Sequence, residues 1–193
     1  MTSPKEPSRR SHTPTHVALL RGINVGGKHK LPMSDLTAMF VNAGCKDVET
    51  YVQSGNVAFS ASAATANRIP RVIANQILER FGFQPVVMVR TGKEIAAVAE
   101  GNPFVGPGVD VTKLLVGFLN EAPDAQLVAK LDPKRSPGDR FAVRGKEIYL
   151  HVPNGILETK FTNAYIDSTL ATTSTFRNWR TVMKLLEMMR EPA

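Results

Sequence analysis

The order of secondary-structure signals is the feature that most restricts the fold of this chain. Between residues 15 and 91, apolar spacing predicts strand, helix, strand, strand, helix and strand. The two middle strands flank Ser54-Gly55, a dipeptide typical of a tight hairpin turn. This is the split βαβ order, in which two helices cover one face of an antiparallel sheet. The predicted strands are 15–20, 48–53, 56–59 and 86–89, and the predicted helices are 32–44 and 69–82.

Residues 111–175 nearly repeat this order. A Thr-rich run then leads into a final helix, and we expect Thr175–Thr181 to form the start of this helix. We therefore predict an α+β protein with two consecutive ferredoxin-like (αβ-plait) domains plus a C-terminal helix. The predicted elements of the repeat are strands at 113–119, 141–143 and 148–152, a capped helix at 124–131 and a helical stretch through Leu157, Phe161 and Tyr165.

The expected domains are residues 15–91 and 111–193, and the second includes the C-terminal helix. Residues 92–110 between them hold a possible helix from Lys93 to Ala99 and a Pro- and Gly-rich linker. Residues 1–14 are polar and basic and offer little to bury, so we expect a disordered tail.

The chain of 193 residues carries 24 Lys and Arg against 17 Asp and Glu, a formal charge of +7. This excess favours anionic partners such as phosphates, nucleotides or nucleic acid, although many bacterial proteins are basic without binding them. No apolar run reaches the roughly 20 residues of a membrane helix, and the polar start lacks a secretory signal, so we expect a cytoplasmic protein without a membrane partner. The single Cys45 excludes an internal disulfide and a thiolate metal site.

A glycine-rich segment, Gly22–His29, follows the first predicted strand. It departs from a phosphate-binding G-x-x-x-x-G-K-[ST] loop, because His29 stands where Ser or Thr would hold magnesium. The antiparallel order and the late helix start at Pro32 also argue against a nucleotide-hydrolysing loop. Anion binding and a solvated glycine turn are both consistent with the segment. Its candidate ligand-binding residues are Arg21, Asn24, Gly26, Gly27, Lys28 and Lys30.

Gln53, Ser54 and Asn56 at the hairpin tip are further candidates, although turn formation explains them most simply. Ser54 lacks the strand-to-helix elbow of a nucleophile. We expect Arg177 and Asn178 in the first turn of the last helix, where free amides and the helix dipole favour an anion.

Lys160 could add another positive charge near the anion, and a surface lysine is the alternative. The histidines show no metal-ligand spacing, so no metal is predicted; they are His12, His16, His29 and His151.

Three long motifs resemble a bacterial family, the domain of unknown function 1697. They are Ala18–Lys28, Thr50–Val57 and Thr175–Thr181, and the likeness spans about Thr15 to Met189. Members often carry Asn at the position of His29 and Ser at that of Thr159. The resemblance implies two consecutive αβ-plait domains. It implies no activity, cofactor or catalytic residue.

We expect a small phosphorylated or otherwise anionic ligand in a cleft between the domains, which requires the glycine segment and Arg177 to face one cleft. One alternative is an enzyme acting on a phosphorylated metabolite, with Lys28 and Arg177 stabilising negative charge. The other is an RNA-binding module. An aromatic RNA-binding motif is missing, and the available sheet aromatics are Tyr51, Phe59 and Tyr149.

Overall fold

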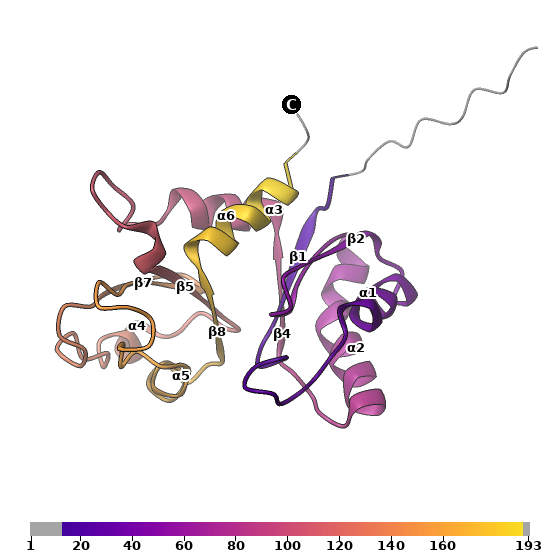
Figure 1. Cartoon of the computed structure of the whole chain (residues 1–193), viewed down its shortest axis with the longest axis horizontal. Coiled ribbons are helices and arrows are strands. Elements are labelled where there is room, and N and C mark those ends of the chain that lie inside the picture. The colour runs from indigo at the N-terminus through magenta and orange to yellow at the C-terminus, as the bar shows by residue number, and fades with distance from the viewer. Residues whose placement is uncertain (1–12, 191–193) are drawn as a thin grey trace, which may run out of the picture.

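The computed structural model of the chain describes residues 13–190, so most of the expected tail at 1–14 lies outside the described residues. Its first domain contains a four-stranded antiparallel sheet in the order β2-β3-β1-β4 (Figure 1). Helices α1 and α2 cover one face of this sheet. The elements are β1 (His16–Leu20), α1 (Met33–Asn42), β2 (Lys46–Tyr51), β3 (Asn56–Ser60), α2 (Ala63–Phe81) and β4 (Val87–Thr91).

The second domain repeats the arrangement with the sheet order β6-β7-β5-β8. Helices α4 and α5 pack on one face of this sheet. Both domains are therefore ferredoxin-like, as the order of sequence signals predicts. The elements are β5 (Leu114–Leu119), α4 (Ala125–Val128), β6 (Arg140–Arg144), β7 (Glu147–His151), α5 (Asn163–Leu170) and β8 (Ser174–Asn178), preceded by the 3-10 turn η1 (Val111–Lys113).

Helices α3 (Gly92–Glu100) and α6 (Trp179–Met188) lie side by side and bridge the two sheets (Figure 1). They bury apolar side chains against the sheet faces that the other helices leave uncovered. The two domains consequently share one central core, in addition to the core that each has under its own helices. Its buried members are Val17, Leu19, Ala58, Met88, Ile95, Val98, Leu114, Val116, Phe118, Tyr149, Trp179, Val182, Leu185 and Leu186.

Helix α2 begins earlier than its apolar spacing predicts, at Ala63 rather than Ile69. Ser62 caps it by accepting a hydrogen bond from the Thr65 amide, and Pro70 lies inside the helix. The predicted start at Ile69 is too late, because proline normally occurs in the first turn of a helix, whereas Pro70 lies inside α2.

The segment expected to open the last helix is mostly strand, and this corrects the placement of Arg177 and Asn178. Residues Ser174–Asn178 form β8, which pairs with β5, and α6 begins only at Trp179. Asn178 is the N-cap, and its side-chain oxygen accepts from the Thr181 amide. Pairing with a distant strand decided this structure, and such pairing has no local signal.

The two helices on the second sheet are shorter than expected. Helix α5 begins at Asn163 after the Thr162 cap, so Leu157 lies outside it and is 95% exposed. Helix α4 covers only Ala125–Val128 of the predicted 124–131. Within residues 13–190, no helix is both long and apolar enough to cross a bilayer.

Candidate functional site

The three sequence motifs meet at the boundary between the domains, around the side chain of Arg177. This residue comes from β8 and is 8% exposed. Each of its five N–H groups has a protein acceptor. Nε donates to Asn56 Oδ1, and Nη1 donates to Thr175 Oγ1 and Phe176 O, both at 2.8 Å. Nη2 donates to Leu20 O at 2.9 Å, Ser54 O at 3.3 Å and Gly55 O at 3.4 Å.

Burial lowers the pKa of Arg177 to about 10, so the guanidinium remains charged at neutral pH. Carbonyl oxygens of the first domain surround this charge. Arg177 therefore clamps β8 to the ends of β1 and β3, and it keeps no N–H for an anion.

Two predicted asparagines also have structural hydrogen bonds. The Asn56 side chain, which is fully buried, donates to Tyr51 O at 3.1 Å and to Ser54 Oγ at 3.0 Å. Asn24 donates to Leu31 O at 2.9 Å and Gln53 O at 3.0 Å, and it accepts from the Leu31 amide at 2.8 Å. These bonds join the glycine segment to the hairpin.

The glycine segment folds back on itself as a small hairpin. The Lys28 amide donates to Val25 O at 3.1 Å, and Gly26 and Gly27 between them have φ of +59° and +75°. Positive φ at both central positions is the requirement of a type I′ turn. His29 stacks on Phe83 with ring centroids 4.5 Å apart. The segment thus has the geometry of a turn, and it exposes the side chains of Lys28 and Lys30.

Arg21 makes a second link between the domains. Its guanidinium pairs with Asp167 on α5, and the other oxygen of Asp167 accepts from the amide and the hydroxyl of Ser174. The glycine segment, the hairpin and β8 thus lie together, with Arg177 buried among them. Ligand binding by the exposed candidates Gly26, Gly27, Lys28, Lys30, Gln53, Ser54 and Asn178 stays a prediction.

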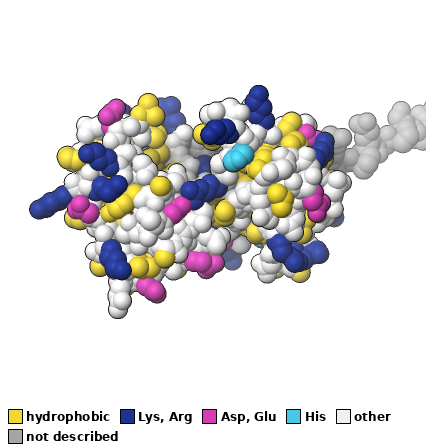
Figure 2. Space-filling view, turned by 90° about the horizontal axis from the view of Figure 1, so that it is seen from below, with side chains coloured by type: hydrophobic (Ala, Val, Ile, Leu, Met, Phe, Trp, Pro, Cys, Tyr) yellow, Lys and Arg dark blue, Asp and Glu magenta, His cyan; other side chains and the backbone are white. Residues whose placement is uncertain are grey.

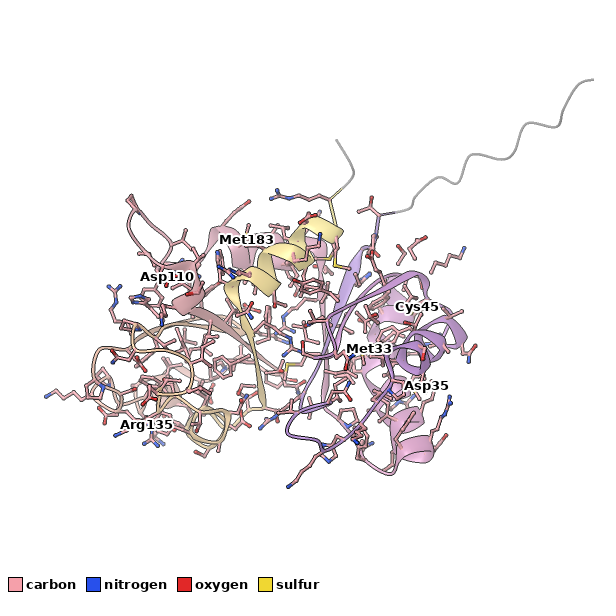
Figure 3. All side chains as sticks on the ribbon, in the orientation of Figure 1. Met33, Asp35, Cys45, Asp110, Arg135 and Met183 are labelled. Atoms are coloured by element: carbon pink, nitrogen blue, oxygen red, sulfur yellow. The ribbon has the colours of Figure 1, made fainter. Side chains whose placement is uncertain are left out.

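Lys160 lies apart from the other candidates. Its carbonyl accepts from Arg135 Nε at 2.9 Å. Figure 3 shows Arg135 at the outer side of the second domain, well away from Met33 at the start of α1. Ligand binding by Lys160 also stays a prediction.

A polar cavity of about 420 Å³ lies between the domains, along the outer edge of β4. At the two ends of β4, Arg21 N donates to Val86 O and Gly92 N donates to Thr15 O. Because bonded residues alternate along an antiparallel strand, the even-numbered residues between 86 and 92 bond to β1. Odd-numbered residues therefore turn their backbone groups to the cavity edge. The lining residues are His16, Ala63, Ala66, Asn67, Pro70, Val87, Met88, Val89, Arg90, Thr91, Glu94, Asn120 and Lys146.

Arg90 holds the second domain against this edge. It is 5% exposed, and its Nε donates to Glu147 Oε1 at 3.1 Å. Its Nη2 donates to Leu119 O at 2.7 Å and Lys146 O at 3.5 Å, while Nη1 donates to Val89 O at 3.2 Å. One N–H of Nη1 has no acceptor among the described residues.

Lys146 is the loosely held cation of the cavity. It occupies the turn between β6 and β7, and its side chain is 46% exposed. Its ammonium lies 3.5 Å from Asn120 O and 3.9 Å from Glu121 Oε2. Contacts this long leave the ammonium free to bind another anionic group.

Two titratable groups complete the lining. Burial lowers the pKa of His16 despite the opposing charge of Glu94, so His16 is neutral at neutral pH. Burial raises the pKa of Glu94, but hydrogen bonds from Thr91 and the charges of Arg90 and Lys146 outweigh it and lower that pKa overall. Glu94 is therefore ionised.

Sequence reasoning missed this cavity because its walls come from short segments far apart in the chain, around residues 16, 63–70, 87–94, 120 and 146. None of these segments contains a recognisable motif. Within the described part of the chain, no group of three or more His, Cys, Asp or Glu side chains could hold a metal ion.

No curated protein matches the chain. Its structure is similar to that of the conserved bacterial protein SP0830 from Streptococcus pneumoniae, with a TM-score of 0.65 and 22% identity over 93% of this chain and 100% of that chain. At this identity the likeness shows the fold alone. The family model described as "Protein of unknown function (DUF1697)" matches residues 14–149, which include the glycine segment and the hairpin. The chain therefore belongs to the DUF1697 family.

Proposed function

We propose that the protein binds a small anionic ligand in the cavity between its two domains. The observation that carries the proposal is that one cavity is lined both by Lys146, whose ammonium is loosely held, and by Arg90, which has one N–H without an acceptor among the described residues. The side-chain amides of Asn67 and Asn120 add neutral donors to the same lining. Charge-assisted hydrogen bonds from Lys and Arg are the strongest that proteins offer to phosphate and carboxylate groups.

The size and the position of the cavity favour a small molecule. Ligand pockets usually enclose about 300–1,000 Å³ and often lie at domain boundaries, and this cavity of about 420 Å³ meets both conditions. The conspicuous sequence motifs then act indirectly. Through Arg21 and Arg177 they fix the two domains in the arrangement that forms the cavity.

The RNA-binding alternative gains no support from the sheet aromatics. Phe59 is fully buried and Tyr149 is 3% exposed, so neither offers a face for base stacking. Tyr51, the third, is half-buried against the shared core, so the three do not form an open stacking surface. On the face that Figure 2 shows, Lys and Arg side chains are dispersed among apolar and acidic ones and form no continuous stripe. We therefore favour the small ligand.

Calorimetric titration with ethyl phosphate tests the proposal. We expect Lys146→Ala to weaken binding at least about tenfold, because it removes the charged donor. Lys130→Ala is the matched control, since Lys130 is an exposed lysine of the second domain outside the cavity lining. It should leave the affinity unchanged.

Lys28→Ala separates the two candidate locations. If it abolishes binding while Lys146→Ala does not, the ligand sits on the glycine segment and the cavity assignment is wrong. If the unaltered protein does not bind ethyl phosphate at millimolar concentration, the proposed function fails.

A further inference from the structure

We infer that the ligand of the interdomain cavity is a zwitterion, which carries an ammonium group in addition to its anionic group. The inference rests on the proposed anion site and adds the chemistry of the other end of the ligand. Two acceptors carry it: a carbonyl on α2 that lacks its usual helical partner, and a carboxylate on α3 with one oxygen that no described residue bonds.

The first acceptor is the backbone carbonyl of Ala66. In a helix this oxygen accepts from the amide four residues later, and that residue is Pro70, which has no N–H. Ala66 and Pro70 both line the cavity, so the carbonyl that lacks its usual amide partner belongs to a residue of the cavity wall. An N–H donor on a ligand would supply the missing hydrogen bond.

The second acceptor is Glu94, which caps α3. Its Oε2 accepts from the Thr91 amide at 2.7 Å and from the Thr91 hydroxyl at 2.8 Å. No donor among the described residues bonds its Oε1. The residue is exposed and lines the cavity, so one oxygen of this ionised carboxylate is accessible to a ligand.

The charges of the lining support a ligand with both signs. Arg90 is paired with Glu147, which leaves Lys146 and Glu94 as opposite charges in one cavity. No ion pair joins Lys146 to Glu94, so each can meet a different end of a ligand. A ligand with only a negative charge would be repelled by Glu94, whereas an ammonium group turns this repulsion into attraction.

The test compares two probes that differ only in the amine, phosphoethanolamine and ethyl phosphate, by calorimetric titration of the full chain. We expect the protein to bind phosphoethanolamine at least about tenfold more tightly. Glu94→Gln should abolish this preference, because it removes the charge while glutamine can keep the helix cap. Glu100→Gln, at the exposed end of the same helix and outside the lining, should not alter it.

Pro70→Ala gives an independent check. It restores an amide to α2 that bonds the Ala66 carbonyl, so the preference for phosphoethanolamine should fall several-fold. Thermal unfolding of each variant verifies that it folds.

Equal affinity for the two probes would overturn the zwitterion inference and leave the anion site intact. A preference that survives in both Glu94→Gln and Pro70→Ala would also overturn it. Binding of neither probe would overturn the proposed function and this inference together.

Discussion

Arg177 shows how a conspicuous polar residue can be misread at the residue scale. An arginine beside asparagine at a helix start suggests an anion site, because both donors and the helix dipole favour negative charge. In the folded chain β8 carries this arginine into the domain boundary, where backbone carbonyls, Asn56 and Thr175 receive all its N–H groups. Its charge is stabilised by protein dipoles, which is how buried arginines avoid the cost of desolvation.

Arg177→Ala should lower the free energy of unfolding by about 3 kcal/mol or more, because buried charge-assisted hydrogen bonds contribute about 1.5–3 kcal/mol each. Urea denaturation measures the change. Arg180→Ala, at an exposed position three residues later, is the control and should stay within about 0.5 kcal/mol. Equal stability of the two variants would show that the clamp contributes little.

At the element scale, the strongest signals were the hairpins, and Gly55 shows why. The residue has a φ of +76°, and an added Cβ would lie 2.8 Å from the Leu20 Cβ and 3.0 Å from the Ile23 Cδ1. Only glycine fits both the left-handed conformation and the close contact. Glycine is therefore required at this turn for two reasons, the left-handed backbone conformation and the close packing against Leu20 of β1.

Gly55→Ala should therefore destabilise the protein more than an alanine at a comparable glycine with open surroundings. Gly108 has the same φ of +76° and no atom within 4 Å of an added Cβ. We expect a loss of about 1–2 kcal/mol for Gly108→Ala from backbone strain alone, and about 1–3 kcal/mol more for Gly55→Ala from overpacking. Thermal unfolding would contradict this if the two variants melted together.

At the scale of the whole molecule, the shared core makes the domains one structural unit. Helices α3 and α6 bury apolar side chains against both sheets, and Arg21, Arg90 and Arg177 each bond across the boundary. Separating the domains would expose this core and leave buried charges without partners, which is costly.

The two domains should accordingly unfold in one cooperative transition. Far-UV circular dichroism follows both sheets, whereas fluorescence follows Trp179, the single tryptophan, which lies in the shared core. The two signals should give the same midpoint and slope in urea. Two separate transitions would show that the domains are energetically independent.

The sequence by itself determined the ferredoxin-like order of both domains, because apolar spacing, hairpin dipeptides and helix stops are properties of neighbouring residues. It also determined that three motifs are unusual, without revealing what they do. The early start of α2 and the strand β8 escaped it, since Pro70 lies inside α2 and β8 depends on pairing with β5.

Only the tertiary structure decided which polar groups have protein partners and which do not. The polar groups of Arg177 and Asn56 are occupied by contacts that join residues far apart in the chain. Lys146, Glu94 and the Ala66 carbonyl became candidates because distant segments meet around one cavity. The role of a polar group depends on its partners in space, and those partners are fixed only when the two domains pack together.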